Sequence, residues 1–332
     1  MTLTISVVTP EGIVLGADSR MLCYRYVGVK KVRARVFRNN ATKIFKIGEQ
    51  VAVTTTGRYY LKRNGSDDAE RRSVSSLLTD FAERNGTHDI WQVKQELREM
   101  IKNEMDLDAE LDHLRKQMEN MIKKEGGKVL DVHVPQHERY DYVDISYRDK
   151  RGRKKQWTEY VSSLTLGICG YYTQPNTGLT WTIPGILSEP EDEWQDKSRE
   201  GIFSTGCDYV VEGLLNLDKS LCRKHVSDIR MSSPAPKYGR MFLSLYDKLK
   251  SEVHLLKEKR NCLTLEKAAQ LVADVITAST LFEQIPIMKS DTTFVNHVPR
   301  VGGPIDIAVI DPKDGFYWHT KKGVKQKEAI PV

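Results

Sequence analysis

The chain begins with two short segments that have the hydrophobic pattern of a β-hairpin. Every second residue from Leu3 to Val7 is apolar and the residues between are polar, which is the period of a half-buried strand. Residues 9–12 read Thr-Pro-Glu-Gly, with Pro and Gly where a type I turn favours them, and the apolar segment 13–18 follows. The sequence therefore predicts two paired strands that start at the second residue.

The remaining pattern predicts alternating groups of strands and helices. A second strand pair is expected over residues 43–58, and long segments of helical periodicity follow it. The order strands, helices, strands, helices, strands favours helices packed on stacked sheets. The expected helices are 66–85 with Ser66 as N-cap, 90–124 as one long charged helix, 208–217 and 263–280; the expected later strands are short polar pieces in 128–160, then 162–172, 177–185, 201–209, 301–310 and 314–322.

The composition is that of a soluble globular protein, with 39% hydrophobic and 29% charged residues in a chain of 332. That length allows one large domain or two ordinary ones. No apolar run approaches the roughly 18 residues of a membrane span, and the chain start lacks the basic and then apolar layout of a secretory signal. We therefore expect a cytoplasmic protein with no membrane partner.

Charge and cysteine content bear on the kinds of site to expect. The formal net charge of +6 permits acidic partners without requiring nucleic acid. The cysteines form no CxxC pair, which favours free thiols over a disulfide framework or a zinc site. They are Cys23, Cys169, Cys207, Cys222 and Cys262.

Four short segments carry a resemblance to a known family. They are the opening hairpin with Thr2, the segment GADSR with Asp18, the segment TKIFKI with Lys43 and the segment TTTG with Gly57. Their spacing is similar to that of proteasome β-type subunits, the N-terminal threonine hydrolases that include the bacterial ring proteases. The later segments LTLGICGY, FSTGCDYVVEGLL, LTLEKAAQLVADVI, VGGPIDIAVI and DGFYW follow the order of that family as well.

The resemblance implies a fold and a mode of action. The fold would be α/β (α+β), a four-layer αββα sandwich of the N-terminal nucleophile hydrolase type, in a single domain over residues 1–332. Residues 86–160 and 221–262 are expected to be insertions in it. The resemblance also implies a homo-oligomeric ring, unfolded polypeptide as substrate, an ATPase or other regulator, and no metal or cofactor.

Thr2 is the candidate nucleophile. A threonine hydroxyl is weak at neutral pH and needs a base, and a free α-amino group with a pKa of about 7.7–8.0 suits that role. Removal of Met1 would place nucleophile and base on one residue. By the resemblance, Lys43 would supply positive charge beside the hydroxyl and Asp18 would hold Lys43. The alternatives are an ordinary second residue and an ordinary surface ion pair.

Two further residues complete the catalytic set that the resemblance implies. Gly57 would give its backbone N–H to the oxyanion of the tetrahedral intermediate, and a simple turn glycine is the alternative. Thr205 would place a hydroxyl near the nucleophile, where the family usually has serine. Thr55 and Tyr59 flank Gly57 where the family has its first specificity pocket.

One departure from the family lies near the end of the chain. The family normally carries an aspartate a few residues before its last glycine pair. Here the pair Gly302-Gly303 follows NHVPRV, which contains no carboxylate. Asp291 and Glu283 are the candidates for that role, and the choice between them stays open.

Other functions also stay open. A catalytically inactive structural ring subunit would keep the fold without the chemistry, and a small-substrate N-terminal-nucleophile amidase would not need a ring. Interleaved aromatic and basic residues at 24–38 and the basic run 150–155 are compatible with nucleic acid. We expect a solvated hairpin at 24–38 and no nucleic-acid partner. The apolar stripe of residues 90–101 is expected to pack on a neighbouring helix or on another subunit.

Overall fold

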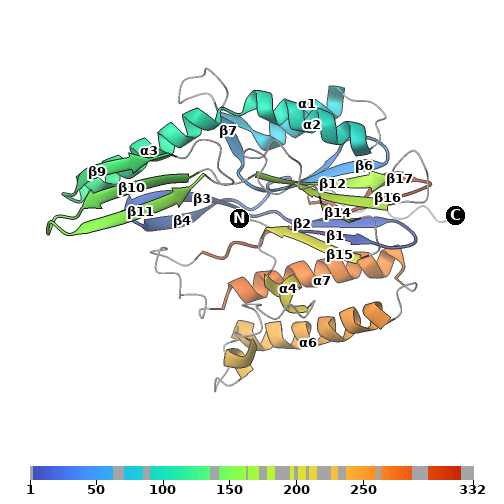
Figure 1. Cartoon of the computed structure of the whole chain (residues 1–332). Coiled ribbons are helices and arrows are strands. Elements are labelled where there is room, and N and C mark those ends of the chain that lie inside the picture. The colour runs from blue at the N-terminus through green and yellow to red at the C-terminus, as the bar shows by residue number, and fades with distance from the viewer. Residues whose placement is uncertain are drawn as a thin grey trace.

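A computed structural model gives the architecture of the chain (Figure 1). It describes residues 3–62, 71–84, 90–134, 142–161, 164–171, 178–183, 195–197, 201–206, 209–214, 226–230, 237–258, 263–285 and 298–322. Within them, two five-stranded antiparallel sheets form the body of the molecule.

The first sheet is built around the opening hairpin. Its spatial order is β15–β1–β2–β16–β17, so the end of the chain pairs with the start. The sequence prediction of a hairpin from the first residues is confirmed, with Thr4 opposite Ala17. The strands are β1 (Leu3–Val8), β2 (Ile13–Asp18), β15 (Gly201–Gly206), β16 (Ile305–Asp311) and β17 (Gly315–Thr320).

The second sheet has the order β14–β13–β12–β6–β5. Apolar side chains of the two sheets meet face to face in a buried cluster that includes Leu15, Ala52 and Ile310. The two sheets therefore share one core, as β-sheets do when they stack. The strands are β5 (Ile44–Lys46), β6 (Val51–Gly57), β12 (Leu164–Tyr171), β13 (Gly178–Ile183) and β14 (Gln195–Lys197); a separate small pair is β7 (Tyr60–Lys62) with β8 (Arg71–Ser73).

Helices cover the outer face of each sheet (Figure 1). α7 (Leu265–Glu283) packs on the first sheet, and α4 (Tyr209–Leu214) and α6 (Lys237–Glu258) pack against α7. α1 (Val74–Arg84) and α2 (Ile90–Glu104) pack on the second. The order helices, sheet, sheet, helices agrees with the four layers expected from the resemblance. None of the described helices is long and apolar enough to span a bilayer.

A third group of elements projects from the body at the left of Figure 1 and is called the arm here. It consists of α3 (Leu107–Lys124), the sheet β9–β10–β11 (Lys128–His133, Tyr142–Arg148 and Lys154–Tyr160), and the hairpin β3–β4 (Met21–Gly28 and Lys31–Arg38). These segments share a core of their own around Trp157, which is fully buried and meets Tyr26 edge to face. The solvated hairpin expected at 24–38 therefore packs on the region expected to be an insertion.

Two helix predictions differ from the structure. The single helix expected over residues 90–124 is two helices, because Asp106 caps α3: its side chain accepts a hydrogen bond from the Ala109 N–H. α2 packs with α1 as expected. The helix expected from Ser66 begins only at Val74, after the strand β8, and Ser66 lies outside the described residues.

Candidate active site

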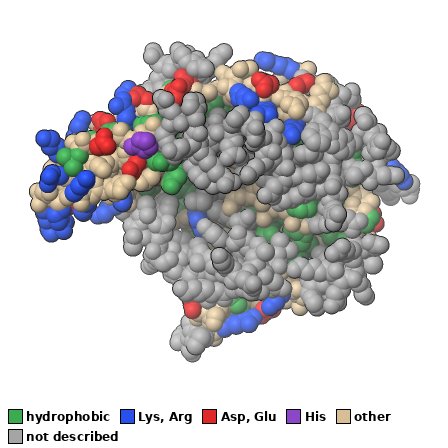
Figure 2. Space-filling model, viewed as in Figure 1, with side chains coloured by type: hydrophobic (Ala, Val, Ile, Leu, Met, Phe, Trp, Pro, Cys, Tyr) green, Lys and Arg blue, Asp and Glu red, His purple; other side chains and the backbone are tan. Residues whose placement is uncertain are grey.

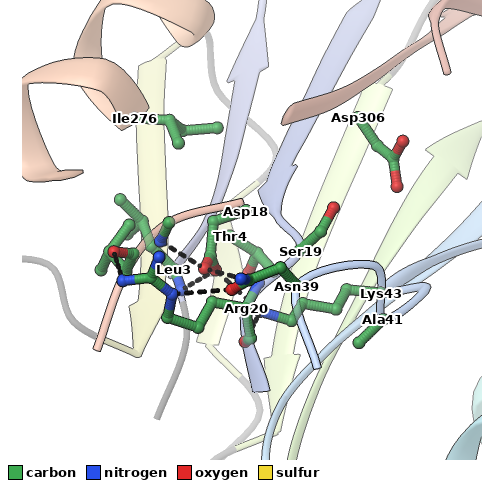
Figure 3. Close-up of polar contacts among 12 residues, drawn as sticks. Leu3, Thr4, Asp18, Ser19, Arg20, Asn39, Ala41, Lys43, Ile276 and Asp306 are labelled. Atoms are coloured by element: carbon green, nitrogen blue, oxygen red, sulfur yellow. Dashed lines mark hydrogen bonds and ion pairs between the residues drawn. The ribbon is translucent and has the colours of Figure 1, made fainter. Parts of the chain in front are cut away.

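The candidate site is centred on Asp18, the last residue of β2. Its side chain is fully buried. Lys43, next to β5, donates from Nζ to Asp18 Oδ1 at 2.8 Å, and the Leu3 backbone N–H donates to the same oxygen at 2.9 Å (Figure 3). The surface ion pair that was the alternative for these residues is therefore wrong, because the pair is buried and shared with the chain start.

The second carboxylate oxygen of Asp18 binds two more backbone groups. The Arg20 N–H donates to Oδ2 at 3.1 Å and the Gly302 N–H donates at 2.9 Å. With four donors the buried carboxylate is well satisfied, as a charge removed from water must be. Asp18 thus ties together the chain start, the turn after β2 and the segment that precedes β16.

Lys43 is held from two sides. Besides Asp18, its Nζ donates to the Arg20 backbone carbonyl at 2.7 Å, and the side chain is only 7% exposed. Thr2 itself lies outside the described residues. Leu3, which follows Thr2, is bound to Asp18, so the structure brings the predicted Asp18–Lys43 pair to the start of β1.

Gly57 ends β6, opposite Leu164 of β12, with a φ of +86° that favours glycine. The next residue, Arg58, forms an ion pair with Glu110 of α3 at 3.1 Å, and both side chains are largely buried. The Gly57 turn is therefore tied to the arm. Of the two predicted pocket residues, Thr55 is buried and Tyr59 stacks edge to face on Tyr60.

Thr205 lies on β15, directly opposite Thr4 of β1. Its hydroxyl oxygen is 2.7 Å from the Thr4 hydroxyl oxygen. The structure thus places a hydroxyl pair between β1 and β15, two residues along β1 from the position of Thr2.

Glu283 lies near the candidate site but acts through another residue. It is buried at the end of α7 and binds the Arg300 guanidinium, with Oε1 at 2.7 Å from Nη2. It also accepts the Arg300 N–H. Arg300 comes two residues before Gly302, so Glu283 anchors the segment that binds Asp18. Asp291, the other candidate, lies outside the described residues.

A second lysine–aspartate pair, largely buried, adjoins the first. Lys322 Nζ binds Asp306 Oδ2 at 2.9 Å, the Ser19 hydroxyl at 3.1 Å, and the Ala41 carbonyl. Ser19 follows Asp18 and Ala41 precedes Lys43 by two residues, so Lys322 clamps the two segments that carry the central pair (Figure 3 shows Asp306, Ser19 and Ala41). We call this group the Lys322 clamp.

Sequence reasoning missed the clamp and the role of Gly302. The signal for Gly302 was the glycine pair itself: Gly303 has a φ of +80°, and a Cβ there would lie 2.6 Å from the Asn39 carbonyl oxygen. Lys322 and Asp306 carried no such signal, because lysine and aspartate are common residues at the ends of strands.

The described residues hold no cluster of three His, Cys, Asp or Glu side chains that could ligate a metal ion. Cys23 and Cys169, the cysteines within the described ranges, form no disulfide bond. The groups gathered at the start of β1 are a buried cation, a carboxylate and a pair of hydroxyl groups.

Comparisons with known proteins do not assign the chain to a family. No family model and no curated protein matches the chain. Among solved structures, the chain is similar to the Anbu (Gly-1) mutant from Hyphomicrobium sp. strain MC1, with 10% identity over 96% of this chain and 85% of that one. The TM-score of 0.37 is too low to establish a shared fold.

Proposed function

We propose that this protein is an N-terminal threonine hydrolase that cleaves peptide bonds with Thr2 as its nucleophile, on a fold of the N-terminal nucleophile hydrolase type. The observation that carries the proposal is the buried Asp18–Lys43 pair, whose shared oxygen Oδ1 also binds the N–H of Leu3. A lysine cation at this place is suited to stabilise a threonine alkoxide at the residue before Leu3.

The proposed reaction has two steps. Once Met1 is removed, the Thr2 α-amine takes the proton of the Thr2 hydroxyl, and the oxygen attacks the peptide carbonyl. The Gly57 N–H is suited to the oxyanion that forms, and the amine returns the proton to the leaving amino group. Water then hydrolyses the acyl-enzyme ester and restores Thr2. Asp18 acts by holding Lys43 and the chain start together.

We also propose that the protein works as a homo-oligomeric ring on unfolded polypeptide.

Glu283 and the Lys322 clamp take part as positioning residues, because both fix segments that contact Asp18 or Lys43.

Hydrolysis of dye-labelled casein by paired variants tests the proposal. Thr2→Ala and Lys43→Ala should each lower the rate by at least about 100-fold, in line with the loss of a nucleophile or its charge partner. Two controls remove the same groups elsewhere: Thr79→Ala on α1, and Lys46→Ala, an exposed lysine three residues after Lys43. Both controls should keep full activity. Full hydrolysis by Thr2→Ala would contradict the mechanism.

A further inference from the structure

The hairpin β3–β4 leads outward from the candidate site. β3 starts at Met21, directly after Arg20, whose carbonyl binds Lys43. β4 ends at Arg38, next to Asn39, whose side chain accepts a hydrogen bond from Arg20 Nε at 2.9 Å. Strands of this length extend about 26 Å at 3.3 Å per residue. The hairpin therefore joins the arm's free end to the Asp18–Lys43 pair.

One face of this hairpin carries a row of exposed cations. Lys31, Arg33 and Arg35 alternate along β4 with Val32 and the buried Ala34, so they point away from the core of the arm. Arg25 on β3 lies directly opposite Arg33. We call Arg25, Lys31, Arg33 and Arg35 the cationic face.

The cationic face is unfavourable for the protein alone. Like charges directly opposite each other on paired strands destabilise a sheet, and Arg25 and Arg33 are such a pair. Within the described part of the chain, none of the four side chains forms an ion pair. An anionic partner would remove this repulsion.

Two carboxylates of the arm's free end, Glu125 and Asp149, are bonded to groups outside the cationic face. Glu125 accepts the Val29 N–H at 2.7 Å, and Asp149 binds Arg153 and Lys155. Figure 2 shows lysine and arginine side chains gathered at that end of the arm. The positive charge therefore continues from the free end onto the cationic face.

Two features favour an acidic polypeptide over nucleic acid as the partner. Proteins that bind single-stranded nucleic acid use open aromatic rings for base stacking. Here one side of the exposed Phe37 ring is covered by the Arg38 guanidinium, 5.1 Å from its centroid. In addition, the row runs along a hairpin whose base, at Arg20, binds Lys43, and cations at every second residue match alternate side chains of an extended peptide.

We propose that the cationic face docks extended, acidic segments of polypeptide substrates and directs them toward the candidate active site. This inference rests on the proposed function and adds a substrate class to it: chains with acidic stretches. Exposed guanidinium groups suit this role because each can bind a carboxylate in a bidentate manner.

Binding can be measured separately from hydrolysis, in the Thr2→Ala variant. The probe is a peptide of alternating glutamate and glycine with an uncharged fluorophore, followed by fluorescence anisotropy at low salt. Its affinity should exceed that of the matching glutamine–glycine peptide by about tenfold or more, and should fall as salt is added. Equal affinity for the two peptides would overturn the proposal.

Charge-matched variants locate the surface. Arg25→Gln/Arg33→Gln/Arg35→Gln should lose about tenfold in affinity for the glutamate peptide. Lys237→Gln/Arg240→Gln/Lys250→Gln removes the same charge from exposed positions of α6 and should bind as before. Thermal melting should show the first variant to be at least as stable as the parent, because a like-charge pair is removed.

The remaining outcomes also decide the matter. An equal loss in the α6 variant would overturn the proposal, because only net charge would then matter. A single-stranded oligonucleotide of equal charge could bind more tightly than the glutamate peptide and lose this binding in the triple variant of Arg25, Arg33 and Arg35. That result would reassign the cationic face to nucleic acid. Failure of the unmutated protein to cleave any peptide would overturn the proposed hydrolase activity, while the binding results would still decide what the cationic face recognises.

Discussion

At the scale of single residues, the site depends on a few buried charges that hold backbone as well as each other. Asp18 binds Lys43 and three backbone N–H groups from separate parts of the chain. The resemblance to proteasome β-type subunits, which the positions of Asp18 and Lys43 share, predicted this pair. The partners of Gly302 and Lys322 could not be predicted, although the glycine pair marked its own position, because these contacts arise only when β16 and β17 pair beside β2.

The Lys322 clamp gives a prediction at this scale. Lys322→Met keeps the length of the side chain but leaves the buried Asp306 carboxylate without its cation, so we expect a loss of about 1–3 kcal/mol in the free energy of unfolding. Urea denaturation measures it. Lys321→Met changes the exposed neighbour that lies over Trp318 and should be within about 0.5 kcal/mol of the parent.

The kinetics of hydrolysis distinguish a positioning role of Lys322 from a purely structural one. If the clamp positions the central pair, folded Lys322→Met protein at low temperature should have a lower kcat with little change in KM. Unchanged kcat in fully folded protein would mean that the clamp serves stability alone.

At the scale of elements, the body followed from the sequence better than the arm did. The β1–β2 hairpin and α7 carry clear periodicity and were predicted correctly, and Thr264 caps α7 as a threonine can. The break between α2 and α3 was missed, although Asp106 is a good N-cap. The packing of β3–β4 against β9–β11 could not be predicted from periodicity, because a local pattern carries no information on contacts between distant segments.

Packing of α7 on the first sheet gives the second prediction. A Cβ on Gly16 of β2 would lie 2.0 Å from Val272 Cγ1 of α7, so the helix can approach the strand only over glycine. Gly16→Ala should therefore cost about 1–3 kcal/mol, the usual range for an overpacked core.

A second substitution checks the cause of that loss. Val272→Ala removes the clashing methyl groups, so adding it to Gly16→Ala should restore part of the stability, whereas Val272→Ala alone should lower it. Thermal unfolding of the three variants measures the coupling. Additive losses would show that the Val272 contact is not the cause.

At the scale of the whole molecule, two sheets between helical layers form a body, and an arm extends from it (Figure 1). The arm is tied to the site at two places: Arg20 at the base of β3, and Arg58 through Glu110. A ring would place several such sites together. Sedimentation equilibrium should therefore give a mass that is a multiple of 38.0 kDa. A monomer would contradict the ring and favour an amidase acting on small substrates.

The central claim is that Thr2 is an N-terminal nucleophile beside the Asp18–Lys43 pair. Intact mass before and after incubation with a peptide epoxyketone tests it most directly, because this reagent closes a ring on both the hydroxyl and the amine of an N-terminal threonine. The account predicts a protein without Met1 that gains a single adduct, and no adduct in Thr2→Ala. A purified protein that retains Met1, or that loses it and forms no adduct, would contradict the account and favour an inactive structural subunit.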